Sequence, residues 1–316
     1  SAMRKKHIGA LAWLLAMLLT LSACGGGGLP PDDPLYPSQT NLAELHIESA
    51  WSVGMTGKGV KIALIDTGVA EHPDLNSRRI TGKSYVDEDE SDLTDKVGHG
   101  TFIAGLLAAS RGNGKGIAGM TDSDLVVLKV WSTSGQASVT TLAQAIRDAV
   151  DVYGCGVINL SMGTPNDSAQ LREAVDYAAQ QGAILVASAG GDSETPVYPA
   201  AYDAVVGVDA LNAAGELPET AARNGSVFVT APGEELVSLG VNGGYVHGGA
   251  GASYAAAQVT ALAAIAKQYQ PYLTCEGFME LLKTTAVDKG AAGYDTDYGW
   301  GAVDAAPLVE ILSSQG

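Results

Sequence analysis

Short apolar runs alternate with segments of helical periodicity along most of this chain. The segments near 99–109, 139–153, 168–181, 254–268 and 276–285 have the spacing of helices. The apolar runs are rich in Val and Ile without regular polar alternation, which is typical of strands buried on both faces. They are KIALID (61–66), LVVLKVW (125–131), VINLS (157–161), AILVASA (183–189) and AVVGVDA (204–210). Strands separated by helices predict a three-layer α/β fold, with one mostly parallel sheet and helices on both faces.

The composition indicates a folded chain with an acidic surface. Hydrophobic residues make up 46% of the 316 residues and charged residues 17%, which allows a sizeable core and excludes wholesale disorder. Lys and Arg number 18 against 35 Asp and Glu, which gives a formal net charge of −17. Because such a surface repels phosphates and the sequence has no visible basic patch, we expect no nucleic-acid partner.

Residues 1–23 are predicted to be a targeting segment and not part of the fold. Ser1 and Ala2 precede Met3 and are interpreted as the remnant of an expression tag. A basic start is followed by an apolar stretch over 8–21. As a helix this stretch would span roughly 21 Å, which is short for a bilayer core of about 30 Å. The pattern therefore favours a secretory signal peptide over a membrane span.

The residues that follow predict a lipid anchor and a tether. The sequence LSAC, which ends at Cys24, resembles the bacterial lipobox, whose cysteine is lipidated; the alternative is an ordinary signal peptide with a chance cysteine. Residues 24–40 are rich first in glycine and then in proline, as expected of a linker. We expect export and anchoring to the bacterial cell envelope, at the outer membrane in a Gram-negative host, with one folded domain over 41–316.

Three residues in glycine-rich surroundings are the candidate catalytic residues. Asp66 ends the first predicted strand, His99 opens a helix in VGHGTFIAG, and Ser253 opens another in GGAGASYAAAQV. In parallel sheets such side chains gather at the carboxyl ends of the strands. A histidine oriented by a buried aspartate can accept the proton of a serine hydroxyl, and a helix N-terminus can stabilise the oxyanion that forms. Taken jointly, the three residues predict nucleophilic catalysis by serine.

The order Asp, His, Ser and the motifs around it resemble the subtilisin-like serine proteases, or subtilases. TGKGVKIALIDTG is similar to the family's aspartate block, HGTFIAG to its histidine block and GASYAAAQV to its serine block. INLSMG (158–163) and YGWGAVDAAP (298–307) extend the resemblance over almost the whole predicted domain. It implies a subtilisin-like fold and a serine endopeptidase. Asp66 would orient His99, His99 would act as general base and acid, and Ser253 would attack the peptide carbonyl.

The resemblance also assigns the substrate-binding and oxyanion positions. Ser161, Met162 and Gly163 would pair with the extended backbone of a peptide or protein substrate and line the pocket beside the cleaved bond. The family's oxyanion asparagine is replaced by Gly191, so that the backbone N–H of Ser253 is the donor that remains. Loss of one such donor lowers the turnover of subtilisin by about 10²–10³-fold. We therefore expect a slow or narrowly specific peptidase, or alternatively a module that binds an extended peptide or protein partner without cleaving it.

Other departures from the family concern the surroundings of the serine and the N-terminal side of the domain. GASYAAAQ (251–258) lacks the family's threonine, proline and histidine, and Phe102 replaces the second histidine of the common HGTH block. We expect looser packing around the nucleophile, with Tyr254 bulkier than the usual methionine. Because only the tether separates Cys24 from the domain, we also expect a form without a pro-domain, which folds unaided or with an activating or folding partner.

Two weaker expectations follow from the resemblance. Asp74 and a loop that contains Asn113 correspond to a structural calcium site of the family, and the alternative is a plain glycine turn with a capping aspartate. No cofactor is otherwise required. Cys155 precedes a strand and Cys275 opens a helix, and in an exported protein the two would form either a disulfide or two buried thiols.

Overall fold

The computed structural model describes residues 30–191 and 194–315. The predicted signal peptide, Cys24 and the first part of the tether lie outside the described residues. Among the helices in the described part of the chain, none is both long enough and apolar enough to cross a membrane.

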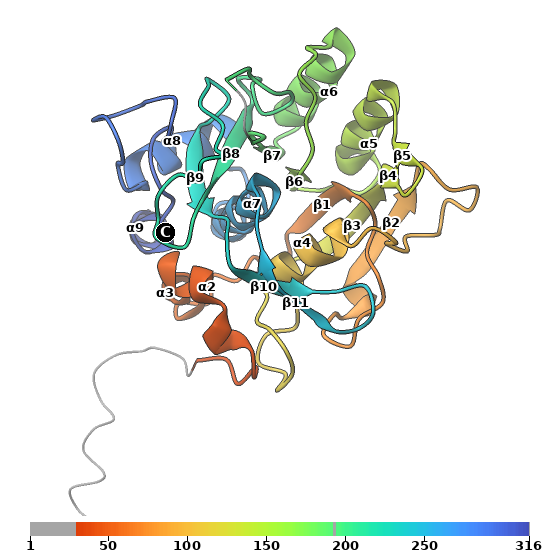
Figure 1. The fold of residues 1–316 in the computed structure, drawn as a ribbon, viewed down its shortest axis with the longest axis horizontal. Helices are drawn as coiled ribbons and strands as arrows, with labels where there is room; N and C mark the ends of the chain where they lie inside the picture. The colour runs from red at the N-terminus through yellow and green to blue at the C-terminus, as the bar shows by residue number, and fades with distance from the viewer. Residues whose placement is uncertain (1–29, 192–193, 316) are drawn as a thin grey trace, which may run out of the picture.

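Seven parallel strands form the central sheet, in the order β2-β3-β1-β6-β7-β8-β9 (Figure 1). Because all the strands are parallel, their carboxyl ends lie at one edge of the sheet. The strands β2 and β3 lie on one side of β1, and β7, β8 and β9 lie on the opposite side of β6. Because the strand order reverses between β1 and β6, a crevice is expected between the carboxyl ends of these two strands. The strands are β1 (Lys61–Asp66), β2 (Ile80–Ser84), β3 (Asp124–Lys129), β6 (Val157–Leu160), β7 (Ile184–Ser188), β8 (Val205–Leu211) and β9 (Val229–Pro232).

Helices cover both faces of this sheet. The helices α4 (His99–Ala108) and α7 (Ala252–Tyr269) pack on one face, while α5 (Val139–Asp151) and α6 (Ala169–Gln180) lie side by side on the other (Figure 1). The helix α8 (Cys275–Thr285) packs on the α7 side of the sheet and contacts α9 (Ala305–Ser314). The predicted three-layer α/β fold is confirmed.

Several short elements were not predicted from the hydrophobic pattern, because most are too short to show a period. The strand β2 lies at one edge of the sheet and is largely half-buried, so its sequence lacks the apolar run of a central strand. The others are η1 (Tyr36–Ser38), α2 (Thr40–Glu44), α3 (Glu48–Trp51), η2 (Ser77–Arg79), the hairpin β4 (Trp131–Ser132) with β5 (Gly135–Gln136), and the hairpin β10 (Leu236–Leu239) with β11 (Tyr245–Gly249). The strand β9 and the longer helix α9 were not predicted either.

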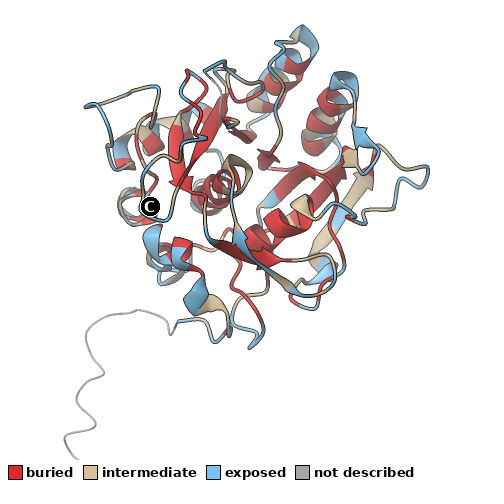
Figure 2. Cartoon of the chain, viewed as in Figure 1, coloured by how far each residue is buried: buried red, intermediate tan, exposed pale blue. Residues whose placement is uncertain are grey.

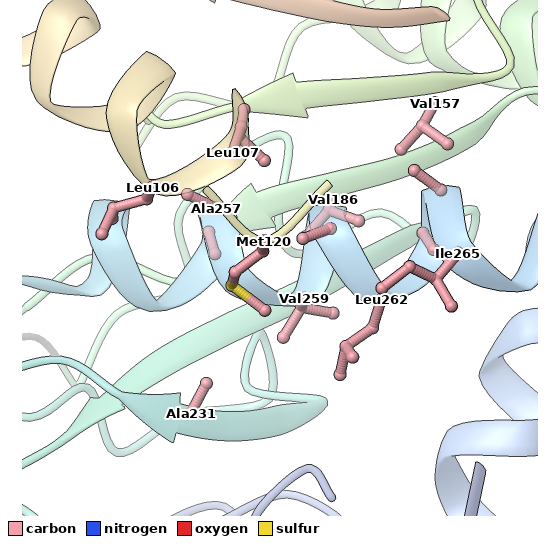
Figure 3. Close-up of a cluster of buried hydrophobic side chains, with 14 of the residues drawn as sticks. Leu106, Leu107, Met120, Val157, Val186, Ala231, Ala257, Val259, Leu262 and Ile265 are labelled. Atoms are coloured by element: carbon pink, nitrogen blue, oxygen red, sulfur yellow. The ribbon is translucent and has the colours of Figure 1, made fainter. Parts of the chain in front are cut away.

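The helix α7 is the central element of the core. All its residues from Ala255 to Lys267 are buried, and Figure 3 shows its apolar side chains lying against those of the surrounding elements. Most of these side chains are small, so the helix can approach the sheet closely. The buried amine of Lys267 donates to the backbone carbonyls of Gly182 and Leu273, at 2.7 and 3.0 Å. In contrast, the outer sides of α5 and α6 are exposed (Figure 2).

Of the two alternatives for Cys155 and Cys275, the disulfide is absent, because both cysteines are free and buried. Cys155 packs in the core on the α5 and α6 side of the sheet and Cys275 in the core on the α7 side, so the sheet separates them. The thiol of Cys275 donates to the backbone carbonyl of Ala204 at 3.3 Å. Burial raises the pKa of Cys155 to about 12 and that of Cys275 to about 11. The structure therefore supports the alternative of two buried, protonated thiols.

The second part of the predicted tether is bound to the domain. The carboxylate of Asp33 accepts hydrogen bonds from the backbone N–H groups of Gly112 and Asn113, at 2.8 and 3.0 Å. The side chain of Gln39 donates to the carbonyl of Ala118 at 3.0 Å and accepts from its N–H at 2.7 Å. Asp33 is almost fully buried. The folded part therefore begins some residues before the predicted boundary at residue 41.

Candidate active site

The candidate catalytic pair comes from two neighbouring elements at the carboxyl edge of the sheet. Asp66 ends β1 and is fully buried, and His99 is the first residue of α4. Nδ1 of His99 lies 2.8 Å from Oδ1 and 3.0 Å from Oδ2 of Asp66. The backbone N–H of Thr67 donates to Oδ1 of Asp66 at 2.7 Å, which fixes the carboxylate. With the proton of Nδ1 held by Asp66, Nε2 of His99 is the nitrogen that can accept another proton.

Local structure explains how the start of α4 comes so close to the end of β1. A Cβ atom at Gly100 would lie 2.1 Å from the backbone carbonyl oxygen of Gly68, so any side chain at this position would push the helix away. The buried carboxylate of Asp95 stabilises the turn before the helix. It accepts hydrogen bonds from the backbone N–H groups of Gly98 and Thr101, both at 2.9 Å. Asp95 was not singled out from the sequence, although it lies four residues before the histidine.

The surroundings of His99 favour its protonated form. Burial by itself lowers the pKa of His99, but the hydrogen bond to Asp66 and the charges of Asp66 and Asp95 outweigh burial, and the pKa is raised above the ordinary value of 6.5. The rings of Trp131 and Tyr254 flank the imidazole, with centroid distances of 5.8 and 5.6 Å. The imidazole of His99 is therefore mostly neutral, and able to accept a proton, only at a pH above this raised pKa.

Ser253 lies in the first turn of α7, directly after Gly251 and Ala252. Backbone N–H groups in the first turn of a helix have no intrahelical acceptor, so they can bind a developing oxyanion. The hydroxyl of Ser253 donates to the backbone carbonyl of Ser161 at 3.2 Å. No hydrogen bond joins Ser253 to His99, both of which are among the described residues. Transfer of the hydroxyl proton to His99 thus requires rotation of the serine side chain.

A buried hydrogen-bonded chain connects Ser161, which directly follows β6, to α7. The hydroxyl of Ser161 donates to the backbone carbonyl of Ser253 at 3.1 Å and accepts from the side-chain amide of Asn159 at 2.8 Å. The carbonyl oxygen of that amide accepts from the hydroxyl of Thr260 at 2.8 Å. These bonds hold the predicted substrate strand and the serine at a fixed separation.

A pocket of about 430 Å³ opens beside Ser253. The predicted substrate-binding residues Ser161, Met162 and Gly163 all contribute to its lining, and so does Gly191. Two acids among the described lining residues, Asp209 and Glu234, were not identified from the sequence. Asp209 is a single charged residue in the apolar run AVVGVDA, a signal that could have pointed to it. The remaining lining residues are Ser188, Gly190, Asp209, Ala210, Pro218, Thr220, Gly233, Glu234, Ala250, Gly251 and Ala252.

Gly191 offers no side-chain donor to the pocket, but its position has room for one. Among the atoms of the described residues, a Cβ atom at Gly191 would meet only the backbone carbonyl oxygen of Thr220 within 4 Å, at 3.2 Å. The φ angle of Gly191 lies outside the left-handed region, so an ordinary residue can adopt this backbone conformation.

Phe102 and Tyr254, the two aromatic residues that replace residues usual in the family, contact each other, with ring centroids 4.3 Å apart. Phe102 is buried, and a Cβ atom at Gly249 would lie 2.3 Å from its Cζ, so the ring occupies space that Gly249 leaves open. Contrary to the expectation of looser packing, the region next to the serine is filled by two aromatic rings.

Asp74 and Asn113 lie together as predicted, but their contacts do not fit a calcium ion. The side-chain amide of Asn113 donates to Oδ1 of Asp74 at 2.8 Å, while Oδ2 accepts from the N–H of Ile117 at 3.0 Å and from the hydroxyl of Tyr245 at 3.3 Å. The carbonyl oxygen of Asn113 accepts from the N–H of Lys115 at 2.8 Å, which fixes the orientation of the amide. Asp74 therefore faces hydrogen-bond donors, whereas calcium requires about six to eight oxygen ligands.

Within residues 30–191 and 194–315, no group of three or more His, Cys, Asp or Glu side chains is arranged to hold a metal ion.

A buried Asp–His pair beside a serine at the start of a helix, on the carboxyl edge of a parallel sheet, is characteristic of serine hydrolases. Residues 57–301 match the subtilase family, peptidase S8, and the chain therefore belongs to this family of serine proteases. The family and the fold inferred from the motifs are thus confirmed.

Known proteases resemble the chain over most of its length. It is 35% identical to the minor extracellular protease Epr of Bacillus subtilis over 268 residues, which are 84% of this chain but only 41% of Epr. It is 34% identical to Subtilisin Savinase of Lederbergia lenta over 266 residues, 84% of this chain and 96% of that protein. The structure is similar to that of a protease from Pseudoalteromonas arctica, with a TM-score of 0.80 and 26% identity, covering 90% of this chain and all of the other.

Proposed function

We propose that this chain cleaves peptide bonds in peptide or protein substrates through an acyl-enzyme on Ser253, with Asp66 and His99 as its partners. The observation that carries the proposal is the hydrogen-bonded pair of His99 and buried Asp66, which lies at the same edge of the sheet as the N-terminus of α7. The match to the subtilase family supports the reaction class.

In the proposed mechanism, a substrate lies along residues 161–163 with its scissile carbonyl next to Ser253. The serine hydroxyl turns from the carbonyl of Ser161 towards Nε2 of His99 and transfers its proton there as Oγ forms a bond to the carbonyl carbon. Asp66 stabilises the resulting imidazolium. His99 then gives the proton to the leaving amine as the C–N bond breaks. A water molecule then gives a proton to His99 as its oxygen bonds to the ester carbonyl carbon. His99 returns that proton to Oγ as the bond between Oγ and the acyl carbon breaks, which releases the acid and restores Ser253.

The oxyanion of each tetrahedral intermediate would be bound mainly by the backbone N–H of Ser253. Gly191 lines the same pocket but supplies no amide, so we propose that the reaction is slow. Loss of one oxyanion donor costs about 10²–10³-fold in turnover but leaves the proton-transfer chemistry intact.

A fluorophosphonate probe tests the activated serine directly. We expect the purified domain to gain the mass of one probe molecule less HF, because Oγ displaces fluoride from phosphorus. The Ser253→Ala variant should gain none, and a Ser52→Ala variant, which lacks only an exposed serine, should be labelled like the parent. Folded protein that stays unlabelled would contradict the proposal. Such a result would favour the alternative, a module that binds an extended peptide without cleaving it.

We also propose that the chain is exported and anchored by a lipid on Cys24. The basic start, the apolar stretch over 8–21 and the lipobox-like sequence support this proposal. In a bacterial host, we expect the full chain in the membrane fraction, with a lipid-modified Cys24 in the mass spectrum of its N-terminal peptide. The Cys24→Ala variant should lose the modification. An unmodified Cys24 in the mature parent protein would overturn the anchor.

A further inference from the structure

Among the described residues that line the pocket beside Ser253, two are acidic, Asp209 and Glu234, and none is basic. Asp209 belongs to β8 and is only 1% exposed, whereas Glu234 is half-buried. The negative charge of the pocket is thus provided by side chains that differ in how freely water can reach them.

Asp209 is held in a fixed position but is not neutralised. Its Oδ1 accepts a hydrogen bond from the backbone N–H of Ala210 at 2.8 Å, and its Oδ2 accepts one from the N–H of Ala222 at 2.7 Å. An ionised carboxylate has about four acceptor sites, so about two remain. No lysine, arginine or histidine of the described chain forms an ion pair with Asp209.

A buried carboxylate that forms no ion pair with a described side chain favours binding of a positive charge from outside the protein. Burial raises the pKa of Asp209 to about 6, because it outweighs the lowering effects of the hydrogen bonds from Ala210 and Ala222 and of the charge of Arg223. Arg223 itself is paired with Asp297. At neutral pH the group is therefore mostly ionised, in a place where ionisation is costly. A cation that enters the pocket and binds the free acceptor sites would remove part of that cost.

We propose that Asp209 makes this pocket selective for a lysine or arginine side chain on the substrate, at the residue that precedes the cleaved bond. The inference rests on the proposed function, because the pocket adjoins Ser253 and residues 161–163. Its volume of about 430 Å³ leaves room for a long side chain. Glu234 adds negative charge to the same lining and so favours entry of the cation.

The test compares peptides that differ only in having Lys, Arg or Leu before the cleaved bond. With the parent enzyme we expect kcat/KM for Lys and Arg to exceed that for Leu by at least about tenfold, and Asp209→Asn to remove most of this preference. Asp203→Asn, a change of an exposed acid near β8, should leave the preference as it is in the parent. Glu234→Gln should reduce the preference by a smaller factor and serves as a second variant if Asp209→Asn does not fold.

The pH dependence gives a readout that a purely structural role of Asp209 would not produce. Below about pH 6, Asp209 becomes protonated and the preference for Lys over Leu should fall, whereas above it the preference should reach a plateau. A bound cation stabilises the ionised carboxylate, so the fall should occur at lower pH in the complex than in the free enzyme. A preference that is constant from pH 5 to pH 8 would count against the proposal.

Equilibrium binding separates this inference from the proposed function. The Ser253→Ala variant should bind the Lys peptide at least about tenfold more tightly than the Leu peptide, whether or not the parent enzyme cleaves either. Equal binding of the two peptides, together with fluorophosphonate labelling of the parent, would overturn the role of Asp209 but would leave the proposed peptidase activity in place. Preferential binding of the Lys peptide by a parent protein that is never labelled would overturn the peptidase and keep the cationic pocket.

Discussion

Replacement of Asp66 by asparagine is expected to lower kcat by about 10⁴-fold. The asparagine amide would fit in the same space, but its NH₂ group would donate to Nδ1 of His99, where the carboxylate of Asp66 now accepts. The proton of the imidazole would then sit on Nε2, the nitrogen that has to receive the proton of Ser253. Steady-state kinetics with one peptide substrate measure the effect, and KM should change far less than kcat.

The same variant should change the acid side of the pH profile. In the parent enzyme, kcat/KM should rise with an apparent pKa above 6.5, because the pKa of His99 is raised and the neutral imidazole is the active base. Once the charge of Asp66 is removed, burial becomes the stronger influence on the pKa of His99 and lowers it. The residual activity should therefore reach its plateau at a lower pH. A folded Asp66→Asn enzyme that keeps more than about a tenth of the parent kcat would exclude Asp66 as the residue that orients the histidine.

Replacement of Gly191 by asparagine is expected to raise kcat by about 10²-fold, by supplying the oxyanion donor that the chain lacks. The side chain can be accommodated because, in the part of the chain that the structure describes, the carbonyl oxygen of Thr220 is the only atom near the new Cβ, and it must yield by only a few tenths of an ångström. The gain should appear in kcat, since the oxyanion forms in the transition state and not in the bound substrate.

The matched control is Gly191→Ala, which adds the Cβ atom without the amide and should not raise kcat. If Gly191→Asn folds normally and turns over no faster than the alanine variant, then the oxyanion site does not limit the rate. The limit would then lie with the serine itself, whose hydroxyl is bonded to the carbonyl of Ser161 and whose neighbour Tyr254 packs against His99.

The positions of the proposed catalytic residues in the fold could be predicted because they lie where elements begin and end. The apolar run of β1 and the helical period of α4 locate Asp66 and His99 at adjacent ends, and the parallel sheet places those ends together. The alanine-rich pattern of α7 likewise locates Ser253 in a first helical turn. These are properties of backbone topology, which hydrophobic patterning largely determines.

Features that depend on the direction of individual side chains could not be predicted. The hydroxyl of Ser253 can turn to either of two acceptors, and a motif does not say which one it bonds. The amide of Asn113 presents its NH₂ group to Asp74 because the N–H of Lys115 occupies its oxygen, a contact that only the folded loop defines. Asp209 was visible as a charge in an apolar strand, but its place in the pocket depends on segments far away in the sequence.

The two free thiols have a consequence for where the domain can fold. Cys155 and Cys275 lie in separate cores with pKa values far above neutrality, and no covalent cross-link depends on them. The same contacts therefore hold the domain together in the reducing cytoplasm and in the oxidising surroundings outside it. No disulfide between Cys155 and Cys275 is therefore needed for the described part of the domain to hold its structure, whatever the redox potential of the compartment in which it folds.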